Sequence, residues 1–382
     1  MEIYVVKQGD TIDRISSIFG IPATEIAFVN QISYPYPLVI GQALLIPVQD
    51  SLQQYKRQVN VNGYAYPYIN SKTLQTTLPY LTDLSVFSYG FTVTGELLPP
   101  AADDNRMINA AMEFGTAPVL TLTPMDSEGR FNNNLISALV SSGSAQENLI
   151  RGLLEILAAK GFRGVDVDFE YIKAEDRDLF TSFVARLSRE LNPYGYWVSV
   201  ALAPKTSSGQ KGLLYEGKDY GGLGAAANSC LLMTYEWGYK YSEPMAVAPV
   251  NMVRRVVEYA VTQIPRNKID LGIPNYGYDW PLPYVQGETA ATTIGNIQAV
   301  QIAAANGARI QFDETAQTPY FNYTAEDGIR HEVWFEDVRS MNAKFSLFEE
   351  FGLRGMGYWQ VMRLFLANWV LLESRFNIIK QG

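Results

Sequence analysis

Residues 164–171 read GVDVDFEY, and this short run joins a strand pattern to three acids. Alternate residues of a β-strand share one face, so Asp166, Asp168 and Glu170 point to one side and the apolar residues between them point to the other. A solvated acidic patch is the alternative interpretation, but a surface strand seldom places three acids on its core-facing side. The pattern therefore predicts a buried strand that carries its acids toward the interior of the protein.

The run is the fourth of eight short apolar segments that alternate with helical stretches. The predicted strands cover residues 62–68, 84–91, 118–123, 161–169, 197–203, 230–235, 269–275 and 352–359. Between them, stretches such as 149–160 and 179–191 repeat apolar residues three and four positions apart, which is typical of helices. Eight strands alternating with helices over roughly 320 residues predict an α/β fold of the (β/α)8, or TIM, barrel type. A doubly wound sheet is the alternative, but no glycine-rich phosphate loop follows any of these strands.

A barrel would place Asp168 and Glu170 at the C-terminal end of an inner strand, where the active sites of this fold form. Burial and mutual repulsion both favour the protonated form of such acids, so at least one of them should keep its proton near neutral pH. A carboxylic acid that keeps its proton can protonate a leaving oxygen, as a glycosidase requires.

The segment between the seventh and eighth predicted strands is longer than a barrel requires. Residues 309–312, 320–325 and 331–335 have the pattern of short strands. We therefore expect a small α+β insertion at about residues 285–340.

The composition excludes several classes of function. The 382 residues carry a net charge of −9, which argues against nucleic-acid binding. No run of 18 apolar residues occurs, so we expect no membrane contact, and the N-terminus lacks the pattern of a classical signal peptide. The single Cys230 cannot form an internal disulfide, and the single His331 rules out a multi-histidine zinc site. We expect neither a metal nor a cofactor, so any hydrolysis must rest on carboxylates.

Residues 1–48 form a separate unit in front of the barrel. Their pattern predicts the order strand, helix, helix, strand, with Asp10 or Thr11 capping the first helix. Residues 49–60 lack apolar periodicity and predict a linker, which leaves residues 61–382 for the barrel. Because this linker has no apolar face with which to dock, we expect the N-terminal unit to act as a tether.

The N-terminal unit resembles the lysin motif (LysM) through the strings YVVKQGDT and IGQALLIP and the Asn-Gln pair at 30–31. The resemblance implies that the unit binds the glycan backbone of peptidoglycan through a turn at 9–11 and a loop at 30–37. The implied glycan-binding residues are Gly9, Asp10, Thr11 and Asn30.

The string GVDVDFE resembles the DGxDxDxE signature of glycoside hydrolase family 18, the chitinase-like enzymes. The resemblance implies a substrate-assisted mechanism, in which the 2-acetamido oxygen of the sugar attacks the anomeric carbon. It implies that Glu170 is the general acid and then the general base, and that Asp168 orients the acetamido group and stabilises the oxazolinium intermediate. It also implies that Asp166 shares a proton with Asp168. Arg163 and Phe169 depart from the signature at positions that carry no catalytic role.

The end of the sixth predicted strand agrees with this resemblance. Residues 233–236 read MTYE and resemble the family's MxYD. The resemblance implies that Tyr235 hydrogen-bonds the acetamido oxygen and that Met233 and Glu236 contact the substrate. Glu236 stands where the family usually has Asp.

Aromatic residues at the ends of the seventh and eighth predicted strands agree as well. Residues 272–280 resemble the family's GxPxYGxxW, which implies that Tyr276 and Trp280 lie in the cleft. Trp359 matches the closing Trp of the family, on which the reacting sugar stacks. A plain core position is an equal alternative for any one of these aromatic residues, but their joint placement at strand ends favours the cleft.

Longer strings narrow the resemblance to one group of the family. MTYEWGY, NYGYDWPLP and HEVWFEDVRS resemble the LysM-bearing enzymes of endospore-forming bacteria that act on cortex peptidoglycan as N-acetylglucosaminidases. The resemblance implies hydrolysis of β-1,4 bonds after N-acetylglucosamine in peptidoglycan, with retention, at the spore coat or cortex or the cell wall. We expect a monomer. Chitin or N-glycans are alternative substrates, and a non-catalytic lectin is disfavoured because such lectins typically lose the catalytic acid that is present here as Glu170.

Overall fold

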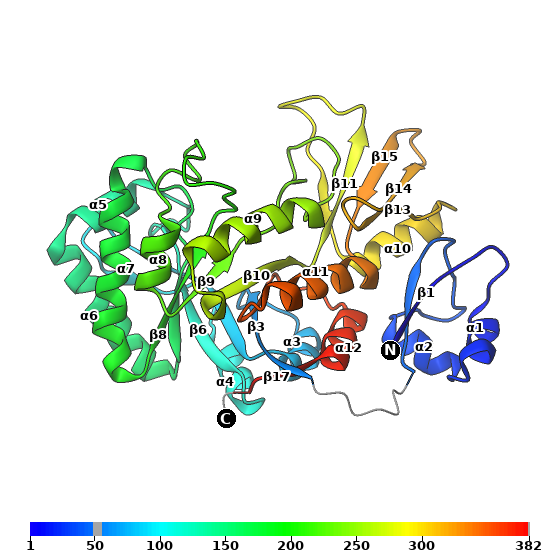
Figure 1. Cartoon of the computed structure of the whole chain (residues 1–382), viewed down its shortest axis with the longest axis horizontal. Helices are drawn as coiled ribbons and strands as arrows, with labels where there is room; N and C mark the ends of the chain where they lie inside the picture. The colour runs from blue at the N-terminus through cyan, green and yellow to red at the C-terminus, as the bar shows by residue number, and fades with distance from the viewer. Residues whose placement is uncertain (49–55, 381–382) are drawn as a thin grey trace.

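The computed structural model describes residues 1–48 and 56–380, and it contains a closed barrel of eight parallel strands (Figure 1). Each strand pairs in parallel with the next, and β3 closes the ring by pairing with both β4 and β16. The barrel strands are β3 (Arg57–Ala65), β4 (Asp83–Phe91), β6 (Ala117–Leu122), β7 (Gly164–Val167), β8 (Trp197–Leu202), β9 (Ser229–Leu232), β10 (Ile269–Pro274) and β16 (Gly355–Trp359). The predicted barrel and all eight of its predicted strands are confirmed.

Helices cover the outside of the barrel, as Figure 1 shows for α6 to α9 and for α11 and α12. The covering helices are α3 (Ser71–Thr77), α4 (Asn105–Glu113), α5 (Asn134–Ser141), α6 (Gly143–Lys160), α7 (Arg177–Leu191), α8 (Tyr220–Ala226), α9 (Val250–Gln263), α11 (Val338–Phe351) and α12 (Leu366–Arg375). Short 3-10 turns lie at Leu78–Tyr80, Ala174–Asp176, Asn192–Tyr194 and Arg266–Lys268. Within the described residues, no helix is both long and apolar enough to cross a membrane.

The outward face of β7 holds the barrel to its helix layer. Val165 and Val167 are fully buried in the main core, and so is Phe169, which follows the strand. The Phe169 ring lies 5.8 Å from that of Phe180 and 6.2 Å from that of Phe183, both on α7. The alternation predicted for this strand is therefore present, although β7 itself ends at Val167.

Two short strands extend the barrel sheet at its edges. β5 (Leu97–Leu98) pairs antiparallel with β4, and β17 (Phe376–Ile378) pairs parallel with the start of β3. Residues 57–60, which we assigned to the linker, are therefore strand, and 49–55 lie outside the described residues. The prediction was wrong for 57–60 because their partner strand lies at the other end of the chain, where no local pattern reveals it.

An α+β insertion separates β10 from α11, and in Figure 1 it stands above the barrel. It consists of β11 (Gly277–Leu282), β12 (Thr292–Ile294), α10 (Asn296–Ala305), β13 (Gln311–Asp313), β14 (Thr318–Thr324) and β15 (Arg330–Trp334). The strands form one antiparallel sheet in the order β12-β11-β15-β14-β13. The insertion begins at Gly277 rather than near residue 285, because β11 follows β10 almost without a loop.

The N-terminal unit has the predicted order of elements. They are β1 (Glu2–Val5), α1 (Ile12–Phe19), α2 (Ala23–Val29) and β2 (Ala43–Ile46), and β1 pairs antiparallel with β2. Thr11 caps α1 by accepting a hydrogen bond from the Arg14 N–H at 3.2 Å, and Gly20 ends the helix in the left-handed conformation with φ 67°.

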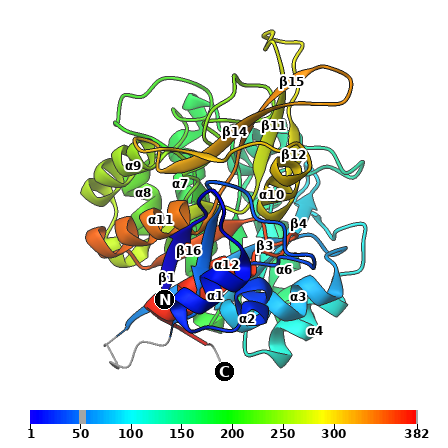
Figure 2. The same ribbon diagram turned by 90° about the vertical axis from the view of Figure 1, so that its right-hand side faces the viewer.

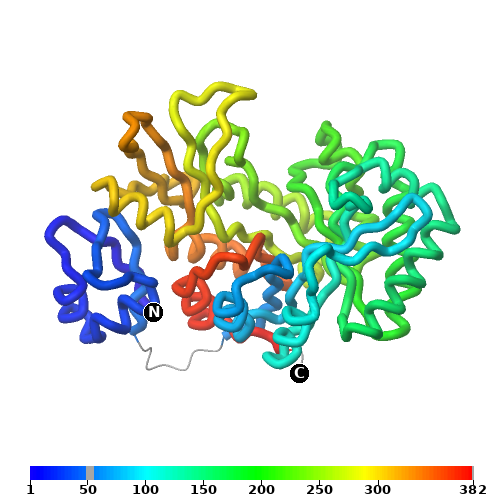
Figure 3. Tube along the Cα trace, turned by 180° about the vertical axis from the view of Figure 1, so that it is seen from behind, coloured from blue at the N-terminus to red at the C-terminus, as the bar shows by residue number. Residues whose placement is uncertain are grey.

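This unit is docked on the rest of the chain, below the insertion in Figure 2 and beside α12 in Figure 3. The Ile310 N–H donates to the Ile40 carbonyl at 3.0 Å, the Leu366 N–H donates to Gln31 Oε1 at 2.7 Å, and the Arg339 guanidinium donates to the Gly41 carbonyl at 3.1 Å. The unit's own Val29 and Leu45 belong to the main hydrophobic core, and Val39 belongs to the core of the insertion. The expected tether is thus replaced by a fixed contact, because the unit docks through its own apolar face and not through the linker.

Candidate active site

The site is built from residues at the C-terminal ends of the barrel strands. Asp166 lies on β7, is 1% exposed and has both carboxylate oxygens occupied. The Tyr64 hydroxyl on β3 donates to one oxygen at 2.8 Å, and the Ser199 hydroxyl on β8 donates to the other at 2.6 Å. Burial raises the pKa of Asp166, and these two hydrogen bonds oppose the rise. Asp166 is therefore held firmly beneath the other acids.

Asp168 and Glu170 follow β7 directly. The Asp168 N–H donates to the Leu122 carbonyl at 2.9 Å, which fixes its backbone, and its side chain is 9% exposed. Asp168 Oδ1 has no hydrogen-bond partner among residues 1–48 and 56–380. Burial, followed by the charges of Glu170 and Asp166, raises the pKa of Asp168 well above its usual range. Burial also raises the pKa of Glu170, which remains partly exposed at the cleft.

These directions agree with the expectation that at least one carboxyl keeps its proton near neutral pH. The three acids thus have distinct environments. Both oxygens of Asp166 accept hydrogen bonds, Asp168 has one oxygen without a partner in the described chain, and Glu170 is partly exposed to solvent.

Tyr235 and Met233 lie just beyond the end of β9, as predicted. Burial and then the nearby carboxylates raise the pKa of Tyr235 well above its usual range, so its hydroxyl stays protonated and can donate a hydrogen bond. Met233 packs in a cluster that includes Tyr64 and Phe87. Both predicted residues therefore lie around the acids.

Trp359, at the end of β16, is partly exposed and is held by aromatic neighbours. Its ring lies 4.9 Å from that of Phe87, 5.7 Å from that of Tyr64 and 6.4 Å from that of Tyr66. Tyr66 in turn stacks on Tyr68 at 5.3 Å, and Tyr68 is 70% exposed. We did not predict Tyr64, Tyr66, Tyr68 or Phe87, although they lie within the first two predicted strands and the strand-end rule could have found them.

Glu236 connects the barrel to the insertion. The Tyr276 hydroxyl donates a short hydrogen bond to Glu236 Oε1, and the Tyr278 hydroxyl donates to the same atom at 3.0 Å. Glu236 has φ 66°, a left-handed conformation that costs a non-glycine residue free energy and tends to occur at functional sites. Tyr276 is 3% exposed, so it supports Glu236 from within the protein.

Trp280 does not lie where we predicted it. Its side chain is completely buried, and its indole N–H donates to the Ser242 carbonyl at 2.8 Å. It packs in a second buried cluster, which joins the insertion to the barrel, beside Tyr278 at 5.4 Å between ring centroids. The expected sugar contact is therefore wrong for this structure, because other side chains cover the Trp280 ring completely.

Lys218 is a residue of the site that no sequence pattern revealed. It is completely buried in the segment between β8 and α8, and its ammonium group donates to the carbonyls of Phe169 and Ala201. Its positive charge lowers the pKa of Asp166, Asp168 and Glu170. A lysine in an irregular segment has no periodicity to mark it as buried.

The glycan-binding residues expected in the N-terminal unit have different surroundings. Gly9 and Thr11 are exposed, and the Asp10 carboxylate accepts hydrogen bonds from the Lys7 N–H and the Tyr4 hydroxyl, both at 2.8 Å. Asn30 is 7% exposed, and its amide is used within the unit. It donates to the Ile26 and Leu45 carbonyls and accepts from the Leu45 N–H, at 2.8 Å each. Asn30 is thus a structural residue here and is not placed to bind a sugar.

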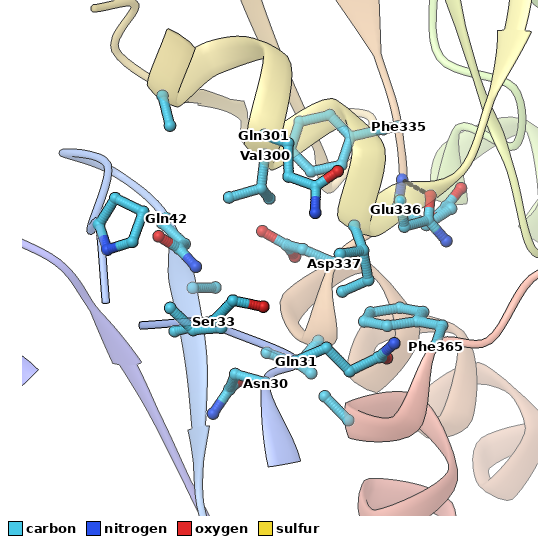
Figure 4. Close-up of a pocket in the computed structure, with 18 of the residues that line it drawn as sticks. Asn30, Gln31, Ser33, Gln42, Val300, Gln301, Phe335, Glu336, Asp337 and Phe365 are labelled. Carbon is cyan, nitrogen blue, oxygen red and sulfur yellow. Dashed lines mark hydrogen bonds between the residues drawn. The ribbon is translucent and has the colours of Figure 1, made fainter. Parts of the chain in front are cut away.

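The predicted loop at 30–37 borders a pocket shared with the rest of the chain (Figure 4). Gln31 and Ser33 line it from the N-terminal unit, and Gln301 and Phe335 line it from the insertion. The loop at 30–37 thus faces the insertion, whereas the turn at 9–11 is open to solvent.

Comparison with known proteins agrees with this geometry. The chain matches the model of glycosyl hydrolases family 18 over residues 128–363 and the model of the LysM domain over residues 4–47. It is 36% identical to the cortical fragment-lytic enzyme of Bacillus subtilis (strain 168), over 100% of this chain and 99% of that protein. The crystal structure of the Bacillus cereus spore cortex-lytic enzyme SleL matches with a TM-score of 0.83 at 36% identity, over 100% of this chain and 87% of that chain.

A chitinase from Chromobacterium violaceum is also similar, with a TM-score of 0.77 at 27% identity, over 83% of this chain and 98% of that chain. The family model covers β7 and its acids, and the relatives named above share the barrel. The chain belongs to family 18 of the glycosyl hydrolases and is a glycosidase that carries a LysM domain at its N-terminus.

Proposed function

We propose that the enzyme hydrolyses β-1,4 bonds after N-acetylglucosamine in spore cortex peptidoglycan and its fragments, with retention at the anomeric carbon. The observation that carries the proposal is the arrangement of Asp168 and Glu170. Asp168 has a buried oxygen without a partner in the described chain, and Glu170 is partly exposed at the cleft with a pKa that burial raises. The cortex as substrate rests on the relatives, which are named as cortex-lytic enzymes.

The first half of the reaction breaks the glycosidic bond. Glu170 gives its proton to the glycosidic oxygen, and the 2-acetamido oxygen of the same sugar attacks C1 to form an oxazolinium ion. Asp168 Oδ1 accepts the acetamido N–H and offsets the positive charge, while the Tyr235 hydroxyl donates to the acetamido oxygen and orients it. Asp166, whose oxygens are held by the Tyr64 and Ser199 hydroxyls, acts on Asp168 through its charge, which raises the pKa of Asp168.

The second half restores the enzyme. The Glu170 carboxylate takes a proton from water, the resulting hydroxide attacks C1, and the oxazolinium ring opens to regenerate the acetamido group. Two displacements at C1 leave its configuration unchanged. Trp359 supplies the apolar face beneath the sugar, and Glu236 and Met233 contribute to its binding.

The LysM domain supplies a second glycan contact, through the exposed turn at Gly9 and Thr11. We propose that the protein acts as a monomer at the spore cortex or cell wall. This location rests on the glycan specificity of the two parts and on the names of the relatives.

Mass spectrometry of the products tests the proposal. Purified cortex peptidoglycan, intact vegetative wall and chitin oligomers are digested separately. We expect fragments from cortex that end in a reducing N-acetylglucosamine and only slow attack on the other two substrates. Fragments that end in a reducing muramic acid would contradict the bond specificity, and preferential cleavage of chitin would favour the chitinase alternative that the similarity to the Chromobacterium enzyme suggests.

A further inference from the structure

Lys218 is anchored between β8 and the segment that follows β7, at the catalytic end of the barrel. Its ammonium nitrogen donates to the Ala201 carbonyl on β8 at 2.9 Å and makes a short hydrogen bond to the Phe169 carbonyl. The Phe169 carbonyl belongs to the peptide that joins Phe169 to Glu170, so the lysine holds the backbone on which the acid is mounted. The Lys205 ammonium donates to the Lys218 carbonyl at 2.9 Å and holds the lysine's own backbone.

A buried ammonium is costly, and its hydrogen bonds here go only to neutral carbonyls. None of the ion pairs formed by residues 1–48 and 56–380 includes Lys218. The cost is offset by attraction to the three acids, since burial lowers the pKa of Lys218 to about 8 and the charges of Asp168, Glu170 and Asp166 hold it up. A residue that served only to tie down a carbonyl would not need this charge.

The lysine has a defined set of neighbours. The charges of Asp168, Glu170 and Asp166, on β7 and the segment that follows it, raise the pKa of Lys218, and so does the Cys230 thiol on β9. Burial raises the pKa of Cys230 to about 12, so this thiol is neutral near pH 7. The Phe180 ring on α7 lies 5.4 Å from the ammonium nitrogen. Within residues 1–48 and 56–380, the three acids are thus the carboxylates whose charge raises the pKa of Lys218.

We propose that Lys218 is a positioning residue that holds the backbone of Glu170 and supplies the positive charge that lets one acid of the set ionise while another keeps its proton. The inference rests on the proposed function, because it acts through Asp168 and Glu170. With the ammonium present, Asp168 can be ionised when the oxazolinium ion forms, and Glu170 can still hold the proton that it must donate.

The pH profile of kcat/KM for K218M tests the proposal. Methionine fills a similar volume without charge. Loss of the positive charge raises the pKa of the acids, so both limbs of the bell-shaped profile should move to higher pH by about one unit, and kcat/KM at the acidic limb should fall about tenfold. Above about pH 8 the wild type should approach the variant, because Lys218 loses its own proton there.

Two further variants separate charge from packing. K218R keeps the charge and should retain the wild-type pH limbs, whereas K218Q keeps a donor without the charge and should shift as K218M does. K344M is the matched control, because Lys344 is also completely buried but pairs with Glu336 at 2.8 Å, away from the three acids. K344M should lower stability without moving the limbs. If K218M does not fold, K218Q and K218R carry the comparison.

The inference would be overturned if the limbs of the pH profile of K218M or K218Q stayed at the wild-type pH. It would also be overturned if the limbs of K218R shifted as far as those of K218M. The proposed function is tested separately by E170Q. An inactive E170Q combined with unmoved limbs in K218M would leave the proposed function standing and remove only the role of Lys218. A fully active E170Q would instead contradict the proposed function.

Discussion

At the scale of single residues, the site depends on three carboxylic acids that have the same functional group but different surroundings. Asp166 accepts hydrogen bonds from two hydroxyls, whereas Asp168 has one oxygen without a partner in the described chain, and Glu170 faces the cleft. Burial raises the pKa of all three, and the ammonium of Lys218 opposes the rise. Position along β7 and the segment that follows it therefore assigns each acid a different task.

The substitution D168N tests the task assigned to Asp168. Asparagine has nearly the same shape but cannot offset a cationic oxazolinium through charge, so kcat/KM on soluble muropeptides should fall roughly 10²-fold or more. A thiazoline analogue of N-acetylglucosamine, which mimics the intermediate, should inhibit the wild type and bind D168N more weakly. Wild-type enzyme that is unaffected at millimolar analogue would exclude participation of the acetamido group.

The acids could be predicted because they lie on β7 or directly after it, where the period of two of the strand pattern assigns each residue to a face. Trp280 could not be predicted correctly, because its motif spans the junction between β10 and the insertion, where the chain changes direction. Asn30 matched a binding motif, but its side-chain amide makes three hydrogen bonds within its own domain. Lys218 carried no signal, since burial of a charged side chain from an irregular segment depends on contacts distant in sequence.

At the scale of elements, β7 has one face for chemistry and one for stability. Its inward face carries Asp166, and the apolar residues of its outward face continue into Phe169, which packs among Phe91, Phe180 and Phe183. A disturbance of this packing would move the segment that carries Asp168 and Glu170. The departure from the family signature at position 169 thus belongs to the helix layer and not to the cleft.

The substitution F169A tests this division at the same element. Removal of a fully buried aromatic ring should lower the free energy of unfolding by about 3–5 kcal/mol, because the transfer energy is lost and a cavity remains. Urea titration followed by circular dichroism measures the change. F114A is the control, since Phe114 is 38% exposed and its loss should cost much less. Equal effects would mean that Phe169 does not hold the layer together.

At the scale of the whole molecule, the LysM domain is part of one body with the barrel and its insertion. Its apolar residues contribute to the cores of both. One backbone hydrogen bond and hydrogen bonds of the Gln31 and Arg339 side chains connect it to the rest of the chain. From the sequence of the linker we could predict only a tether. The residues that dock the domain follow the same apolar pattern as the residues of its own core, so the sequence does not distinguish them. A fixed domain presents its exposed turn at 9–11 at a constant position relative to the cleft.

The substitution G41A tests the fixed seam. A Cβ atom at Gly41 would lie 1.8 Å from the Ile310 carbonyl oxygen, and Gly41 has φ 87°, so alanine should separate the domain from the insertion. We expect a larger radius of gyration in small-angle scattering. G20A is the matched control, because Gly20 has φ 67° but nothing within 4 Å of its Cβ position. A wild type with the same radius of gyration as G41A would instead favour the tether.

The most direct test of the account is the turnover of E170Q on soluble muropeptides and on purified cortex fragments, measured beside the wild type. Glutamine keeps the shape of the side chain but cannot donate a carboxylic proton. We predict a loss of at least ~10²–10⁴-fold in kcat on both substrates, with the melting temperature and binding to insoluble peptidoglycan unchanged. Turnover at the wild-type rate by a folded E170Q would contradict the assignment of Glu170 as the acid that breaks the glycosidic bond.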